Sequence, residues 1–171
     1  METVRRALLR AEARSTCRNI RLAAVIETPS GRLVEGWNGP PERCGPHPAC
    51  RLGGPITPAN LRLCPGVHAE VRALCRAAAR GVAVEGGTLY LSRWFPCAPC
   101  ARALIEAGIV RLVVTEKLSL AKDDCYNFVL AEELLGAAGV ETVIDPGLLE
   151  FGQEEGVVRG PLSQPGFQVD P

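Results

Sequence analysis

Two short motifs have the residue types and spacing of metal-dependent chemistry. Segment 68–70 reads His-Ala-Glu, and segment 96–100 reads Pro-Cys-Ala-Pro-Cys. One imidazole and two thiolates are three of the four ligands that tetrahedral zinc takes, and catalytic zinc sites keep the fourth position for water. Structural zinc sites, in contrast, fill all four positions with protein atoms. The two motifs together therefore predict a catalytic zinc site.

The predicted zinc ligands are His68, Cys97 and Cys100, and the predicted proton carrier is Glu70. Cys97 and Cys100 lie three residues apart at the start of an expected helix, so both sulfurs face one side. The helix N-terminus also favours their thiolate forms. Zinc lowers the pKa of a bound water to about 7, and Glu70 is close enough to carry its proton to a ring nitrogen. His-x-Glu followed by Pro-Cys-x-x-Cys resembles the signature of zinc deaminases, and this resemblance implies hydrolytic deamination with release of ammonia.

Two other interpretations of the motifs stay open. In the first, the histidine and cysteines belong to a closed structural zinc site, and Glu70 is a solvated surface residue. In the second, the domain is a zinc-stabilised binding module in which Glu70 is dispensable. The occurrence of both motifs on consecutive strand–helix units favours catalysis over either alternative.

The elements that must position these residues follow from hydrophobic periodicity and from glycine and proline breaks. We expect helices over 3–14, 69–80, 97–107 and 128–138, and strands over 20–26, 32–37, 88–92, 110–115 and 140–144. Strands that alternate with helices pair in parallel through right-handed crossovers. The fold class predicted is a three-layer α/β/α domain around a five-stranded mixed sheet. The second helix is expected to bury the face that carries Val71, Leu74, Cys75 and Ala78.

Two further segments differ from the rest of the chain in being rich in proline. We expect the domain to occupy residues 1–145 and a Pro- and Gly-rich extended tail to occupy 146–171. Segment 38–66 is rich in proline, and a loop of this length is usually functional or held by something. It carries residues whose local spacing could hold a second, structural zinc, namely Cys44, His47, Cys50 and Cys64. Free thiols are the alternative, but a metal would supply order to a loop that is poor in large apolar side chains.

The overall composition is that of an ordinary soluble protein. The chain has 171 residues, of which 47% are hydrophobic and 22% charged, and its 19 basic and 19 acidic residues cancel. Proteins that bind polyanions usually carry a basic excess, so we expect no nucleic-acid partner. We also expect no membrane partner, because no stretch is apolar enough to span a bilayer. The predicted location is the cytoplasm, where the eight cysteines would stay reduced.

From about Ala7 to Ile144 the chain resembles the cytidine/deoxycytidylate deaminase superfamily, and the dCMP deaminase branch in particular. The segments that carry the resemblance are 14–17 (Arg-Ser-Thr-Cys), 36–41 (Gly-Trp-Asn-Gly-Pro-Pro), 67–70 (Val-His-Ala-Glu), 87–90 (Gly-Thr-Leu-Tyr) and 95–101 (Phe-Pro-Cys-Ala-Pro-Cys-Ala). The resemblance implies a cytidine-deaminase-like fold and conversion of dCMP to dUMP and ammonia. It also implies a pyrimidine nucleotide as the small-molecule partner, a homo-oligomer, and the zinc ligands and proton shuttle named above.

The resemblance implies two further assignments. Asn38 falls on the family's sugar-binding asparagine, although Trp37 stands where the family usually has tyrosine. A plain turn residue is the alternative for Asn38. The family's structural zinc implies a second ligand set, in which Cys17 takes the place of Cys44. This set is Cys17, His47, Cys50 and Cys64.

Other substrate contacts are open to more than one interpretation. Trp94 and Phe95 could pack against the pyrimidine or fill the core, and the Ala69 amide could donate to the pyrimidine carbonyl. Arg43 could contact a 5′-phosphate, and its rivals are Arg18 and Arg51. Segments 22–24 and 122–127 depart from the family pattern. The alternative substrates are therefore a riboflavin-pathway pyrimidine, free cytidine and an antibiotic nucleoside.

Overall fold

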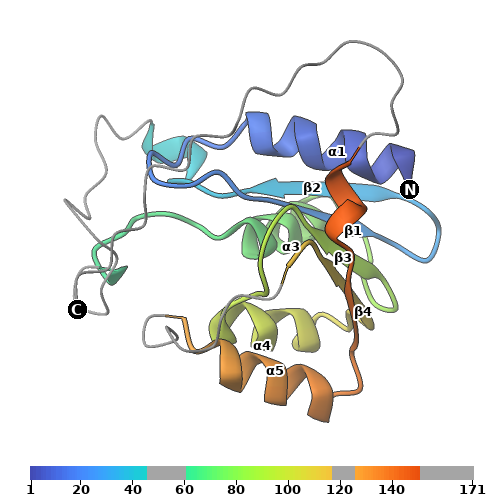
Figure 1. Ribbon diagram of the computed structural model, residues 1–171. Helices are drawn as coiled ribbons and strands as arrows, with labels where there is room; N and C mark the ends of the chain where they lie inside the picture. The colour runs from blue at the N-terminus through green and yellow to red at the C-terminus, as the bar shows by residue number, and fades with distance from the viewer. Residues whose placement is uncertain (46–60, 117–125, 151–171) are drawn as a thin grey trace.

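The computed structural model describes residues 1–45, 61–116 and 126–150. Its centre is a five-stranded sheet of order β2-β1-β3-β4-β5 (Figure 1). The strands are β1 (Ala23–Glu27), β2 (Leu33–Trp37), β3 (Thr88–Leu91), β4 (Arg111–Val114) and β5 (Glu141–Ile144). β1 is antiparallel to both β2 and β3, whereas β3, β4 and β5 run parallel. The predicted mixed sheet is confirmed.

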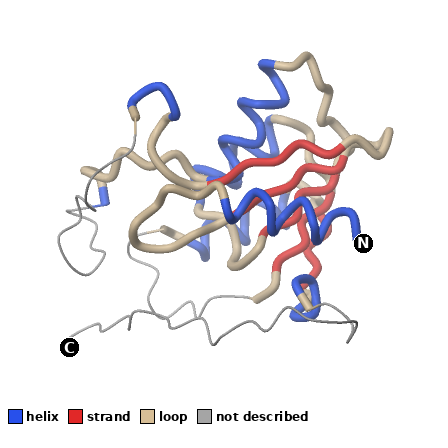
Figure 2. Tube along the Cα trace, turned by 90° about the horizontal axis from the view of Figure 1, so that it is seen from above, coloured by secondary structure: helices blue, strands red, loops and turns tan. Residues whose placement is uncertain are grey.

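Helices cover both faces of this sheet. The α-helices are α1 (Glu2–Ala13), α3 (Ala69–Ala79), α4 (Ala98–Glu106) and α5 (Phe128–Ala137), and the short 3₁₀ helices are η1 (Glu42–Cys44) and η3 (Pro146–Leu149). One apolar cluster joins α3, α4 and α5 to one face, and a second joins α1 and η3 to the other. Figure 2 views the fold from the side of α1, which lies over the strands. The predicted three-layer α/β/α fold is confirmed, and no described helix is long and apolar enough to cross a membrane.

The predicted buried face of α3 is wrong. Cys75 and Ala78 are exposed, and Val71 and Leu74, which pack against the core, are only partly buried. The residues of α3 that are buried are instead Ala69, Glu70, Arg72, Ala73 and Ala77. Small side chains face the sheet because β2 passes very close to this helix, so the larger apolar residues are displaced toward the helix edges.

Two predictions differ from the structure by more than one residue at an element boundary. The first strand begins at Ala23 and not at Ile20, because the Asn38 side chain, and not a neighbouring strand, bonds the Ile20 carbonyl and the Leu22 amide. At the other end, residues 146–149 form η3 in place of the expected extended tail. Leu148 is fully buried, and Arg5 donates hydrogen bonds of 2.9 and 3.1 Å to the carbonyls of residues 148 and 147. The rest of the expected tail, residues 151–171, lies outside the described residues.

The close approach of β2 to α3 depends on Gly36. A Cβ atom at this position would overlap the Ala69 carbonyl oxygen and lie 2.5 Å from the Ala73 nitrogen. We expect Gly36→Ala to lower the free energy of unfolding by about 1–3 kcal/mol, because overpacking forces backbone shifts. Urea-unfolding curves of the variant and the parent measure this effect.

A matched control for Gly36→Ala is available in α5. A Cβ atom at Gly136 would meet nothing within 4 Å, so Gly136→Ala should raise the free energy of unfolding by about 0.5–1 kcal/mol through helix propensity alone. Equal effects of the two substitutions would contradict the packing argument.

Candidate active site

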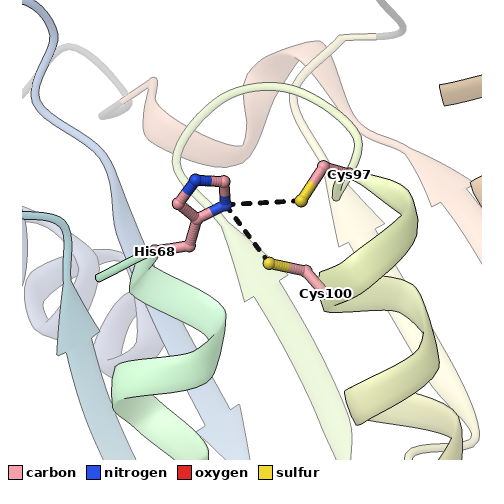
Figure 3. Close-up of side chains that lie close together, drawn as sticks. All are labelled: His68, Cys97 and Cys100. Carbon is pink, nitrogen blue, oxygen red and sulfur yellow. Dashed lines mark hydrogen bonds between the residues drawn. The ribbon is translucent and has the colours of Figure 1, made fainter. Parts of the chain in front are cut away.

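Three of the predicted zinc ligands converge where two helices begin (Figure 3). His68 is the N-cap of α3, Cys97 is the N-cap of α4, and Cys100 lies in the first turn of α4. The His68 Nδ1 atom is 3.3 Å from the sulfur of each cysteine, and the three donor atoms lie within 4.8 Å of one another. Tetrahedral zinc with ordinary bond lengths places nitrogen and sulfur ligands about 3.6 Å apart. The donor set therefore fits a zinc ion with only small side-chain movements.

The backbone around the cluster explains why these residues meet. The carboxyl end of β3 leads through the short segment 92–97 into α4, as is usual for sites at the edge of a parallel sheet. Pro99 occupies the first turn of α4, where its missing N–H costs nothing. The segment before His68 is held by an antiparallel bridge between Gly39 and Val67. The Tyr126 carbonyl accepts a 3.1 Å hydrogen bond from the amide of Ala98 at the start of α4.

Hydrogen bonds within the cluster shift the pKa values of all three groups. The bond with Cys100 lowers the pKa of the Cys97 thiol to about 5, with burial opposing and His68 adding to the effect. The bond with Cys97 raises the pKa of His68 to about 9, although burial opposes this shift. The bond to Cys97 and burial both raise the pKa of the Cys100 thiol. One thiolate is thus favoured near neutral pH, and metal binding must release the remaining protons.

Glu70 lies in the first turn of α3, next to the cluster. The residue is only 7% exposed. Burial raises the pKa of its carboxyl group, while His68 opposes the shift and Cys97 adds to it. A buried carboxyl group whose pKa is raised above its ordinary value can hold a proton and return it.

Two adjoining cavities open at the cluster. The larger, of about 450 Å³, is bordered by His68, Cys97 and Cys100. The smaller, of about 100 Å³, is bordered by His68, Cys97 and Glu70. The described residues that line both cavities include no lysine or arginine. The site therefore combines a metal-binding group, a buried carboxyl group and a largely apolar pocket.

Comparison with known families matches this geometry to one of them. The model for the cytidine and deoxycytidylate deaminase zinc-binding region matches residues 1–116. The chain belongs to this deaminase family. The match covers α1 through β4 and includes all of the residues that form the cluster.

The curated relatives match this chain over only part of their own length. Deoxycytidylate deaminase of Enterobacteria phage T2 is 34% identical over 82 residues, which are 48% of this chain and 40% of the phage protein. ComE operon protein 2 of Bacillus subtilis is 28% identical over 127 residues, which are 74% of this chain and 61% of that protein. The chain thus spans less than two thirds of the length of these curated relatives.

A solved structure shares the deaminase fold over most of both chains. It is the dCMP deaminase of cyanophage S-TIM5 in complex with dCMP and dUMP, with a TM-score of 0.62 and 23% sequence identity. The alignment covers 82% of this chain and 93% of that chain. The similarity supports the cytidine-deaminase-like fold that the sequence predicts.

Asn38 borders the smaller cavity of the deaminase and also supports its wall. Its Oδ1 atom accepts a hydrogen bond of 2.8 Å from the Leu22 amide and lies 2.6 Å from the Ser15 hydroxyl. Its Nδ2 atom donates a 2.8 Å bond to the Ile20 carbonyl. These bonds show that Asn38 supports the wall of the cavity, and its contact with a sugar stays a prediction.

The other predicted substrate contacts divide into two groups. Trp94 and Phe95 border the smaller cavity, and the Trp94 indole donates a 3.1 Å hydrogen bond to Glu116. Ala69 is fully buried and borders neither cavity. Arg43, in η1, and Arg18 are exposed and also border neither cavity, while Arg51 lies outside the described residues.

Tyr126 borders both cavities and was missed by the sequence analysis. Its ring centroid lies 6.4 Å from that of His68 and 5.3 Å from that of Phe128. It lies in segment 122–127, which the sequence marks only as a departure from the family pattern. An aromatic residue in this segment gives no local sequence signal of a binding role, because only the folded structure places it beside the pocket.

The expected second zinc site is not assembled by the described residues. Cys17 and Cys64 border the smaller cavity, and Cys44 is exposed in η1. No group of three potential ligands within residues 1–45, 61–116 and 126–150 contains any of these cysteines. His47 and Cys50 lie outside the described residues, so this site stays a prediction.

Proposed function

We propose that this protein is a zinc-dependent hydrolytic deaminase that converts dCMP and water to dUMP and ammonia. The observation that carries the proposal is the group of His68, Cys97 and Cys100, with its donor atoms within 4.8 Å, next to the buried Glu70 at a pocket. The substrate is supported by the phage T2 relative named deoxycytidylate deaminase. It is also supported by the structural neighbour that binds dCMP and dUMP.

The residues of the cluster would divide the work between them. His68, Cys97 and Cys100 would hold the zinc ion, which when bound lowers the pKa of a water molecule at its open position. Glu70 would accept a proton from the attacking water and deliver it to ring nitrogen N3 of the pyrimidine. The carboxylate would then take the remaining proton of the hydroxyl group added to the ring and deliver it to the amino group, which leaves as ammonia. Its burial suits both steps, because a raised pKa keeps the proton available for return.

The substrate contacts are part of the same proposal. The remaining N–H of Asn38 would donate to the sugar, Trp94 and Phe95 would pack against the pyrimidine, and the Ala69 amide would donate to its carbonyl. Neither Ala69 nor Arg43 borders the described cavities, so the contact of the Ala69 amide with the pyrimidine and that of Arg43 with a phosphate would both require a movement at the site. A cytoplasmic location and a homo-oligomer stay predictions, and sedimentation velocity tests the second.

A substrate panel tests the proposed reaction. Purified protein is incubated with dCMP, dCTP, deoxycytidine and the riboflavin-pathway pyrimidine, and ammonia release is measured for each. We expect kcat/KM to be highest for dCMP, by at least about tenfold over deoxycytidine, because a phosphate contact worth about 1.4 kcal/mol gives that ratio. Equal turnover of deoxycytidine would refute the nucleotide assignment. Absence of ammonia with all four compounds would instead favour a binding module.

Metal analysis of the same protein counts the zinc ions. We propose two per chain, one in the cluster and one held by Cys17, His47, Cys50 and Cys64, with Cys44 as a substitute ligand. A value of one would remove the second site.

A further inference from the structure

Arg72 is a buried arginine on α3 that reaches the turn after β2. Its side chain is 8% exposed, and its Nη2 atom donates two hydrogen bonds of 2.7 Å, to the carbonyls of Gly39 and Pro40. Among the described residues it forms one ion pair, a long one of 4.0 Å with the largely exposed Glu42. Burial of a charge with so weak a partner is costly. The two hydrogen bonds to backbone carbonyls are the main interactions that offset this cost for Arg72.

The turn that Arg72 holds forms part of the pocket. Asn38 and Gly39 border the smaller cavity. The Gly39 carbonyl also accepts a 2.8 Å bond from the Val67 amide, and the Gly39 amide donates a 3.2 Å bond to the Val67 carbonyl. Val67 immediately precedes His68. One carbonyl oxygen thus receives bonds both from α3 and from the segment that leads into it.

Arg72 faces away from the pocket. Two residues along an α-helix are about 200° apart, so Glu70 and Arg72 lie on nearly opposite sides of α3. Arg72 borders neither cavity, and its guanidinium carbon lies 5.4 Å from the Trp37 ring. The Arg72 side chain therefore has no direct contact with either described cavity, and its hydrogen bonds lead to the turn.

We propose that Arg72 is a positioning residue of this deaminase, which fixes the turn at residues 38–40 relative to the catalytic helix. The inference rests on the proposed function and extends it. With Arg72 in place, the pocket wall at Asn38 keeps a defined distance from Glu70 and His68. Without it, the link between the turn and the catalytic helix is reduced to the backbone bridge between Gly39 and Val67, while Asn38 keeps its bonds to Ser15, Ile20 and Leu22.

Arg76 provides a matched control one turn further along α3. Its guanidinium carbon lies 4.6 Å from the same Trp37 ring, and its buried Nε atom makes no hydrogen bond within the described residues. Arg76→Met therefore removes one positive charge and one cation–π contact from the same ring but no bond to the turn.

The experiment compares Arg72→Met with Arg76→Met in the full chain. For Arg72→Met we expect the KM for dCMP to rise about tenfold and kcat to change by less than about threefold, as for a loss of substrate positioning. We also expect amide hydrogen exchange at Gly39 and Val67 to become at least about tenfold faster, because the local opening of the turn is less costly. Arg76→Met should change each quantity by less than about twofold.

Each other outcome overturns the proposal. Unchanged KM and exchange in Arg72→Met would mean that the turn is held without the guanidinium group. Equal changes in both variants would assign the effect to charge or to packing on Trp37. If Arg72→Met does not fold, Arg72→Lys replaces it, because one ammonium group cannot reproduce the geometry of the guanidinium fork. Its exchange at Gly39 and Val67 should still exceed that of Arg76→Met, and equality would refute the proposal.

Exchange is measured without substrate, so it does not depend on the identity of the substrate. A wild-type protein that fails to deaminate dCMP would refute the proposed function. Faster exchange confined to the Arg72 variant would still support the link between α3 and the turn.

Discussion

Glutamine in place of Glu70 is expected to lower kcat for dCMP by about 10²–10⁴-fold, the usual contribution of a general acid–base group. Glutamine has nearly the same shape as glutamate but cannot accept and return a proton. The KM and the zinc content should stay close to those of the parent, because Glu70 is not one of the three residues that form the metal-binding group. Steady-state ammonia release and metal analysis measure the three quantities.

The folding stability of this variant provides an internal check. Burial raises the pKa of Glu70, so the folded protein binds the carboxyl proton more tightly than the unfolded chain does. That stabilisation is fully present below the ordinary pKa of glutamate and is lost as the pH rises through the raised value. Glu70→Gln should therefore be at least as stable as the parent at neutral pH. Glu133→Gln, at an exposed position on α5, is the control, and undiminished activity of Glu70→Gln would refute the proposed proton transfer.

Serine in place of Cys100 is expected to abolish zinc binding at the cluster and to lower deamination by more than about 10³-fold, because a thiolate ligand of a catalytic metal is removed. Treatment of the parent with a strong chelator should have the same effect, and added zinc should restore the activity of the parent but not that of the variant. Zinc content and ammonia release are measured on the same samples.

Cys75→Ser is the matched control for the loss of a thiol. Cys75 is exposed on α3 and belongs to no group of potential metal ligands among the described residues. This variant should keep the zinc content and activity of the parent. A Cys100→Ser variant that retains both would show that the metal, or the reaction, lies elsewhere.

The sequence predicts the layers and the sheet well because each strand and helix carries its own periodic pattern. It also predicts which residues form the cluster, because Cys97 and Cys100 are close in sequence and parallel strands align the starts of successive helices. The buried face of α3 was predicted incorrectly, since hydrophobicity alone favoured Val71, Leu74 and Cys75. The actual face is set by the proximity of Gly36 on β2, which is a contact between distant segments.

Other features depend on contacts that no local pattern encodes. The bonds from Asn38 to Ile20 and Leu22 shorten the first strand, and Leu148 is buried because Arg5 holds the backbone around it. Tyr126 reaches the pocket across a segment that matches no motif. Each case joins residues whose partners could only be identified once the chain was folded.

His68 and Cys97 occupy positions whose side chains usually close off the first amides of a helix, yet neither makes such a bond here. Each helix therefore lacks the stabilisation of a side-chain N-cap, which is typically about 1 kcal/mol. A metal ion bound by both residues would link the start of α3 to the start of α4 and so offset the missing caps. The affinity for the metal and the stability of the contact between α3 and α4 would then be coupled. A substitution that tightens the packing of these two helices should therefore also change the metal affinity.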